Sequence, residues 1–296
     1  MEEHANQAPI QPDNTKHEIG TYWDVFLEPS KCFEGLNLRP RWLVPMVLCV
    51  VIAFVTSLVI YSRVDMEHVI REQITSNPRA AQLTDEQLEQ QVEMGAKFGR
   101  ISTLAAPFII TPLFMLLTAG LIMLGIFVTG SEVTGQVETK KCSKCGGEVP
   151  LNASAGDKCP HCGVVWGTEI HPVPRQAESS SAFKKVFSIT ASSMLFYNAA
   201  AGILTIAVIL TASDPNSLNL RNIVSTNPAF LVDANESKAL YAFLSHLDIL
   251  VWYTIYLIGL GISKITAKCS VIKGMVIIGF WYVLYVVAHT GIAALF

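Results

Sequence analysis

The sequence WLVPMVLCVVIAFVTSLVIY, from Trp42 to Tyr61, contains no charged residue over twenty positions. An α-helix rises about 1.5 Å per residue, so about twenty apolar residues can cross the roughly 30 Å hydrocarbon layer of a membrane. Arg39, Arg41 and Arg63 flank the run, as is typical of the ends of a membrane-spanning helix. The stretch therefore predicts a transmembrane helix and indicates the class of the whole protein.

Composition supports the same class. Hydrophobic residues make up 51% of the 296 residues and charged residues only 15%, whereas soluble domains carry about 25% charged residues. The net charge of −3 gives no reason to expect a nucleic-acid partner. The first apolar run follows a long polar segment rather than a short basic one, so we expect the first span to be retained rather than cleaved as a signal peptide.

Three further runs are long enough to span, namely residues 101–128, 186–212 and 274–296. Pro107 and Pro112 predict a kink in the second of them, because proline removes a backbone hydrogen bond inside a helix. Before that run, Met66 to Ile74 shows helical spacing of its apolar residues. Thr84 to Gln87 then resembles a capping box that would start a new helix.

A fourth span is short of apolar length. Residues 249–263 provide only about fifteen positions. To cross the membrane, the helix must start near Leu240 and carry His246 and Asp248 inside its outer end. A carboxylate in the apolar layer is costly and marks a functional site by default. The alternatives are that Asp248 reaches the interface or caps the start of the helix.

Other polar groups in the spans are candidates for the same intramembrane site. We place Asn198 and His289 beside Asp248 and His246, with Tyr197, Trp252, Tyr253, Trp281 and Tyr282 as available partners. The alternative is that these residues pack or anchor at the membrane interface, which is common for Trp and Tyr.

The distribution of Lys and Arg predicts the orientation. With the N-terminus inside, the inner segments carry 14 of these residues and the outer segments carry 7. An excess of positive charge marks cytoplasmic loops. The sequence thus predicts an all-α membrane protein, a bundle of five transmembrane helices with the N-terminus inside and the C-terminus outside.

The central loop contains the sequence CSKCGGEVPLNASAGDKCPHCG, with two Cys-x-x-Cys pairs formed by Cys142, Cys145, Cys159 and Cys162. Four thiolates complete a tetrahedral shell around one structural Zn²⁺ and leave no position for a substrate. Gly146 and Gly163 follow the second cysteine of each pair and favour tight turns. The pattern is typical of a small zinc ribbon. An iron site of rubredoxin type and a redox dithiol pair are the alternatives. His161, which lies between two ligands, is expected to be an exposed residue that does not bind the metal.

The predicted orientation and the cysteines agree with each other. The ribbon falls on the cytoplasmic side, where thiols stay reduced and available to a metal. Cys32, Cys49 and Cys269 are scattered, so the odd total of seven does not suggest a disulfide framework. Few apolar residues lie between the pairs, so the metal is expected to supply the folding free energy of this segment.

The chain thus divides into four parts. Residues 1–20 form a polar, disordered tail, and residues 21–128 hold a pre-helical segment and the first two spans. Residues 129–185 form the cytoplasmic loop with the ribbon at 142–162, and residues 186–296 hold the last three spans. Pro29 can open a short helix in the pre-helical segment, whose aromatic residues and neighbouring cations predict either a position in the headgroup layer or ordinary packing.

Several stretches resemble the bacterial branch of the Yip domain family, whose eukaryotic members are linked to vesicle traffic and small GTPases. The similar stretches are 25–33, 40–45, 182–187, 244–253, Gly259-Leu260-Gly261, and Lys273-Gly274 with Trp281. The resemblance implies five membrane helices and a cytoplasmic N-terminus. The family's cytosolic Asp-Leu-Tyr-Gly-Pro-type motif is absent, which departs from the GTPase-linked role, and the four cysteines resemble an insertion between the second and third helices.

Two functional hypotheses follow. The first is a non-enzymatic membrane scaffold or trafficking protein whose ribbon contacts a cytoplasmic protein partner, with oligomers possible. The second is a small-solute or lipid transporter that uses Asp248 in the bundle. A third, weaker hypothesis makes the ribbon a metal or redox sensor. The sequence contains no phosphate-binding Gly-rich loop, HExxH or GxSxG pattern, so we expect no enzyme activity.

Overall fold

The computed structural model describes residues 16–75, 84–133, 140–142, 144–145, 148–149, 158–159, 162–165, 182–218, 223–224, 226–233, 237–266 and 269–295. The helices are α1 (Lys16–Leu27), α2 (Pro29–Leu38), α3 (Leu43–Arg63), α4 (Met66–Thr75), α5 (Asp85–Val128), α6 (Ala182–Thr211), α7 (Lys238–Ser245), α8 (Ile249–Ile265) and α9 (Val271–Leu295). Two short 3₁₀ helices, η2 (Pro215–Ser217) and η3 (Pro228–Leu231), and two strands, β1 (Lys140–Lys141) and β2 (Glu148–Val149), complete the described elements. The fold is therefore all-α apart from one small hairpin.

Four helices are long and apolar enough to cross a membrane: α3, α5, α6 and α9. A fifth crossing requires α7 and α8 together, and these two helices meet at a bend of 44°. The expected continuous helix through His246 and Asp248 is therefore broken at those residues. The described residues thus include four helices that could cross a membrane, or five if the bent pair crosses as one.

The predicted helix starts of α2, α4 and α5 are present. Pro29 occupies the first turn of α2. The Thr84 hydroxyl accepts a hydrogen bond from the Gln87 backbone N–H at 3.3 Å, and the Gln87 side chain accepts one from the Thr84 N–H at 3.1 Å. This capping box begins a helix of 44 residues that continues without interruption through the second span. Helix α1 begins at Lys16, within the predicted tail, and residues 1–15 of that tail lie outside the described residues.

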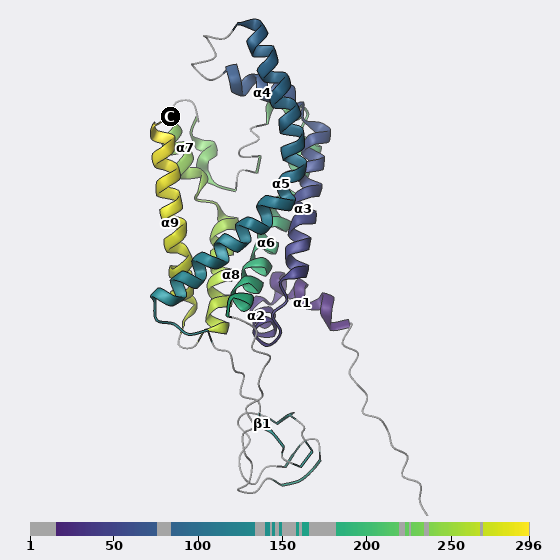
Figure 1. The fold of residues 1–296 in the computed structure, drawn as a ribbon, viewed down its shortest axis with the longest axis vertical. Helices are drawn as coiled ribbons and strands as arrows, with labels where there is room; N and C mark the ends of the chain where they lie inside the picture. The colour runs from purple at the N-terminus through teal and green to yellow at the C-terminus, as the bar shows by residue number, and fades with distance from the viewer. Residues whose placement is uncertain are drawn as a thin grey trace, which may run out of the picture.

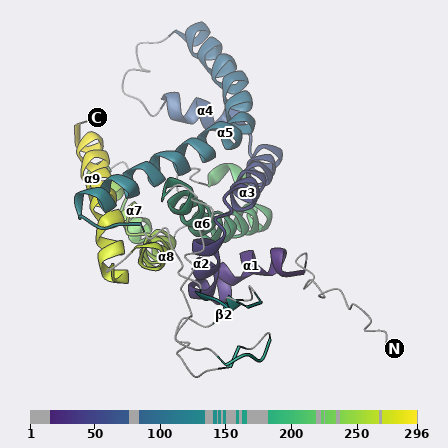
Figure 2. The same cartoon turned by 60° about the horizontal axis from the view of Figure 1, so that its bottom comes forward.

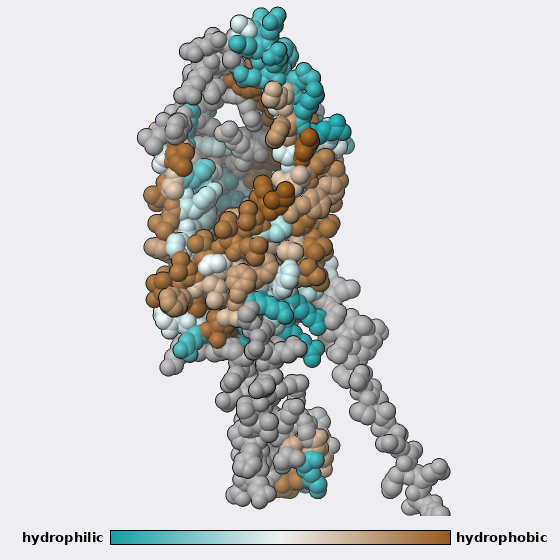
Figure 3. Space-filling model, in the orientation of Figure 1, coloured by the Kyte–Doolittle hydropathy of each residue, from teal (hydrophilic) through white to brown (hydrophobic). Residues whose placement is uncertain are grey.

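Successive long helices run in opposite directions (Figure 1). We call the end with α2, the start of α6 and the end of α8 the α2 end, and the opposite end with α4, α7 and the end of α9 the α4 end. Figure 2, viewed with the α2 end turned forward, shows α6 and α8 between α9 on one side and α3 on the other. Large apolar side chains of α3, α5 and α9 are exposed on the outside of the bundle (Figure 3). This surface is compatible with contact to lipid chains.

Helix α5 changes direction midway, so that one half follows α3 and the other half crosses the bundle obliquely towards α9 (Figure 1). The helix contains Pro107 and Pro112, as the predicted kink requires. Phe108 lies beside Phe54 of α3, with ring centroids 5.2 Å apart. At the α2 end, Gly125 lies against Ile277 of α9, where an added Cβ would collide with the isoleucine side chain. The oblique half of α5 therefore covers the α2 half of the bundle.

Helix α8 lies at the centre of this covered half. All its residues from Leu257 to Ile262 are buried, as are residues 185–195 of α6. Gly259 and Gly274 bring the backbones of α8 and α9 together, because a Cβ on Gly274 would lie 2.5 Å from the Gly259 carbonyl oxygen. Gly261 makes a similarly close approach to Ile189 of α6. Packing around α8 thus depends on the absence of side chains at these positions.

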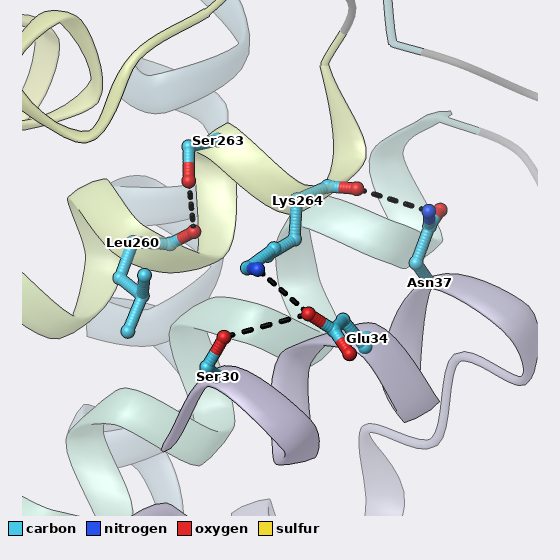
Figure 4. Close-up of polar contacts among 6 residues, drawn as sticks. All are labelled: Ser30, Glu34, Asn37, Leu260, Ser263 and Lys264. Atoms are coloured by element: carbon cyan, nitrogen blue, oxygen red, sulfur yellow. Dashed lines mark hydrogen bonds and ion pairs between the residues drawn. The ribbon is translucent and has the colours of Figure 1, made fainter. Parts of the chain in front are cut away.

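Helix α2 covers the α2 end of α8 through polar contacts (Figure 4). The Asn37 amide donates to the Lys264 carbonyl oxygen at 3.0 Å and accepts from the Lys185 ammonium at 2.8 Å. The Lys264 ammonium pairs with Glu34 at 2.6 Å, and this pairing lowers the pKa of the Glu34 carboxyl. The Asn37 amide thus satisfies a carbonyl in the last turn of α8, which has no partner within its own helix.

The pre-helical segment packs rather than lying free on the surface. Cys32, Phe33 and Leu36 are buried against α6 and α8. Trp23 and Leu27 are instead 64% and 79% exposed. The packing alternative is therefore confirmed for the inner face of α2, and the exposed pair remains available for the predicted contact with headgroups.

We predict that Gly274→Ala lowers the free energy of unfolding in detergent by about 1–3 kcal/mol, the usual cost of overpacking a core. The reason is the clash of the new methyl group with the Gly259 backbone. Thermal unfolding of purified protein measures the effect. Gly279→Ala is the matched control, since a Cβ at Gly279 of the same helix meets nothing within 4 Å. Equal melting temperatures for the two variants would contradict the close approach of α8 and α9.

Candidate functional site

The four predicted cysteine ligands form one cluster. Their sulfur atoms all lie within 4.8 Å of one another, with Cys142–Cys162 and Cys145–Cys159 both at 3.7 Å. Sulfurs bound at about 2.3 Å to one tetrahedral ion lie about 3.8 Å apart. The donor set and its spacing therefore fit a single thiolate-bound metal ion. It is the only such group of metal-ligating side chains found among the described residues.

Short backbone turns position these sulfurs. Cys142 directly follows β1, which pairs with β2 in an antiparallel hairpin. Around the second pair, the Cys159 N–H donates to the Val164 carbonyl at 2.8 Å, and the Gly163 N–H donates to the Cys159 carbonyl at 2.9 Å. Gly163 has φ +68°, a left-handed conformation that other residues adopt only with strain. The predicted role of Gly163 is thus confirmed, whereas Gly146 and His161 lie outside the described residues.

Electrostatics favour metal binding at the first pair. The backbone N–H groups of Cys145 and Lys144 lower the pKa of the Cys142 thiol to about 6, whereas burial and the neighbouring sulfurs raise the pKa of the Cys162 thiol to about 12. A thiolate, rather than a thiol, is the form that binds a metal. Cys142 and Cys159 are buried and Cys145 and Cys162 are exposed, so one side of the cluster faces solvent. An ion bound by all four sulfurs would have a closed shell with no position for a substrate.

Asp248 caps helix α8. Its Oδ1 accepts hydrogen bonds from the backbone N–H groups of Leu250 at 2.7 Å and Val251 at 3.3 Å. Its Oδ2 accepts a third from the Thr226 hydroxyl at 2.5 Å. The Ile249 N–H also donates to the Thr226 carbonyl at 3.3 Å. The capping alternative is therefore confirmed, and Thr226 is a partner that no sequence pattern singled out.

His246 and His289 are brought together across the bend. His246 lies between α7 and α8, and its Nε2 is 3.1 Å from Nδ1 of His289 on α9. The Tyr282 hydroxyl donates to the His246 carbonyl at 2.7 Å. Tyr285 presents its ring to both histidines, with centroids 5.1 and 5.9 Å away. Two of the predicted intramembrane residues therefore share one aromatic cluster.

The Asn198 side chain makes its hydrogen bond within its own helix. Its amide donates to the Met194 carbonyl at 2.9 Å, one turn earlier in α6. Its neighbour Tyr197 interacts electrostatically with Asp248 and Tyr285. Tyr282, Tyr285 and His289 recur at i, i+3 and i+7 of α9, a spacing that places them on one helical face. That periodicity was available in the sequence and would have identified Tyr285.

Comparison of the chain with protein-family models, with curated proteins and with solved structures finds no match in any of the three. The functional assignment therefore rests on the residues and geometry of this chain.

We predict that Asp248→Ala lowers the free energy of unfolding by about 1–2 kcal/mol, because it removes the cap of α8 and leaves Thr226 without its acceptor. Asp248→Asn should stay within about 0.5 kcal/mol of the unsubstituted protein, since asparagine is a comparable cap residue. Thermal or denaturant unfolding in detergent compares the two variants. Equal losses of stability for Ala and Asn would show that the negative charge, rather than the cap, is what matters.

Proposed function

We propose that this chain is a multi-pass integral membrane protein of Yip-domain type, a non-enzymatic scaffold or membrane-organising protein. Its ribbon holds one structural Zn²⁺ and contacts a protein partner on the cytoplasmic side. The observation that carries the proposal is the closed set of four cysteine sulfurs on a helical bundle with an apolar exterior. A saturated metal site stabilises a small surface but performs no reaction.

The surface of the ribbon suits a docking role. Cys145 and Cys162 are exposed, and so are Lys144 and Lys158. Val165 at the second turn is 54% exposed. An apolar side chain beside lysines offers a partner both a contact area and charge complementarity. The metal would hold this surface in one conformation, which lowers the entropy cost of binding.

The proposed orientation follows from positive charge. The α2 end carries Lys31, Arg39, Arg41, Lys184, Lys185, Lys264 and Lys273. The described residues towards the α4 end carry fewer, namely Arg63, Arg71, Lys97, Arg100 and Lys238. An α2 end in the cytoplasm satisfies the excess of positive charge inside. It also places the central loop, which begins at the α2 end, in a reducing compartment.

The alternative function is transport of a small solute or lipid. The open α4 half of the bundle supports it, whereas the contacts of Asp248 count against it. Figure 3 shows a hollow with hydrophilic atoms between α9 and the half of α5 that follows α3. The Asp248 carboxylate, however, already accepts three hydrogen bonds within the protein. A residue fully used as a helix cap is a poor carrier of a proton or cation, so the scaffold is favoured.

We predict about one Zn²⁺ per chain in the purified protein and loss of that zinc in the double variant Cys142→Ser with Cys145→Ser. The metal content is measured by atomic emission on detergent-purified samples. Protease resistance of the bundle should remain unchanged, because the spans do not depend on the ribbon. Cys269→Ser serves as the control, since Cys269 lies outside the cluster. Zinc near zero in the unsubstituted protein would exclude a zinc ribbon.

We further predict that affinity capture from detergent extracts recovers a protein partner with the unsubstituted chain and with Asp248→Asn, but not with the zinc-free double variant. The carrier hypothesis makes the opposite prediction for Asp248→Asn, namely loss of solute uptake in reconstituted vesicles. Capture that is unaffected by loss of zinc would remove the docking role from the ribbon.

A further inference from the structure

The α4 half of the bundle is more open than the α2 half. Residues 185–195 of α6 are all buried, but Ile203 and Leu204 near its other end are exposed. In α8, Trp252 and Tyr253 are exposed whereas Leu257 to Ile262 are buried. The cause is the bend of α5, which carries this helix away from α6 and α8 at one end and across them at the other (Figure 1).

The histidine pair lies in this open half, at the bend between α7 and α8. His289 is exposed and His246 is half-buried, so the pair is accessible to solutes. The exposed fraction of Tyr285, which contacts both rings, is 54%. Imidazole nitrogens are preferred ligands of Zn²⁺, Ni²⁺ and Cu²⁺.

The distances between the two rings suit a shared ion. Two nitrogens bound at about 2.05 Å to one metal lie about 2.9 Å apart for a right angle and about 3.3 Å apart for a tetrahedral angle. The observed separation of 3.1 Å falls between these values. It also permits a direct hydrogen bond between the rings, so the nitrogen separation alone does not distinguish the two arrangements.

The ring positions can be compared with the collinear arrangement and with a shared ion. Two imidazoles whose nitrogens point straight at each other at this separation would have centroids about 5.4 Å apart. Two imidazoles directed at one common ion would have centroids about 4.8 Å apart. The observed centroid separation is 4.9 Å, with ring planes at 84°. The two nitrogens therefore do not point straight at each other.

The surroundings hold both rings in place. The Tyr282 hydroxyl fixes the His246 backbone, and the Tyr282 and Tyr285 rings meet the His246 ring edge-on. Tyr285 also stacks on His289 at 29°. Rigid ligands lose less conformational entropy when a metal binds.

We propose that His246 and His289 chelate one divalent transition-metal ion at the α4 end, a site distinct from the four cysteines. Two side chains supply ligands and water completes the shell. Because His246 lies at the break between α7 and α8 and His289 lies on α9, the ion fastens the bent pair to the last helix. The metal therefore holds the bend between α7 and α8 in place against α9.

The test uses the full chain with Cys142, Cys145, Cys159 and Cys162 all replaced by serine, so that the cysteine cluster cannot contribute. Zn²⁺ is titrated into this detergent-purified protein by calorimetry. We expect one binding site, weakened at least about tenfold by either His246→Ala or His289→Ala. His68→Ala, an exposed histidine on α4, is the matched control and should change nothing. No zinc binding by the four-serine protein before any histidine is replaced, or equal binding by all variants, would overturn the proposal.

A second measurement separates ligand loss from misfolding. Zn²⁺ should raise the melting temperature of the four-serine protein, because a ligand that binds only the folded state stabilises it. The melting temperatures of the two alanine variants without metal show whether each variant is folded. Cu²⁺ bound to the parent should show two nitrogen ligands by electron paramagnetic resonance, and one in each alanine variant. Two nitrogens in both alanine variants would place the ion elsewhere.

Discussion

The close approach of α8 to its neighbours is the constraint on which the bundle depends. In lipid the hydrophobic effect does not drive helices together, so association relies on van der Waals contact and interhelical hydrogen bonds. Glycine provides that contact by letting backbones approach. The carbonyl of Gly259 lies where a side chain on Gly274 would have to stand, and Gly261 faces Ile189 in the same manner. Helix α8 can therefore be buried between α6 and α9 with only 17 residues of its own.

The short length of α8 creates a second requirement that side chains meet at both of its ends. A helix of 17 residues is about 25 Å long, less than the hydrocarbon thickness, so unpaired backbone groups at its ends would be costly. Asp248 accepts from the free N–H groups at the start, and the Asn37 amide donates to the Lys264 carbonyl near the end. Together these two contacts satisfy backbone groups at both ends of a helix that is too short to cross the membrane alone. The polar residues at the ends of α8 thus have a structural role, since they satisfy its terminal backbone groups.

Hydropathy was sufficient to predict the long helices, because about twenty apolar residues leave few other solutions in a membrane protein. The capping box at Thr84 and the turn at Gly163 were also predictable, since both depend on residues adjacent in sequence. The break at His246 was predicted only through the alternative in which Asp248 caps the start of the helix. The apolar pattern favoured a longer helix, and the competing contact between Asp248 and Thr226 joins residues 22 positions apart. The pairing of His246 with His289 over 43 positions was likewise beyond local reasoning.

The four cysteines lie in the connection between α5 and α6, which explains how the bundle tolerates this segment. Helix α5 ends and α6 begins at the same end of the bundle (Figure 1), and Val133 forms a bridge with Thr266 just beyond α8. A connection between two nearby points can lengthen at little cost, because doubling a loop adds only about 0.6 kcal/mol of closure entropy. The ribbon must then supply its own folding free energy, which four thiolates and one metal ion can do. Among the described residues, the cysteine cluster and the buried core around α8 have no member in common.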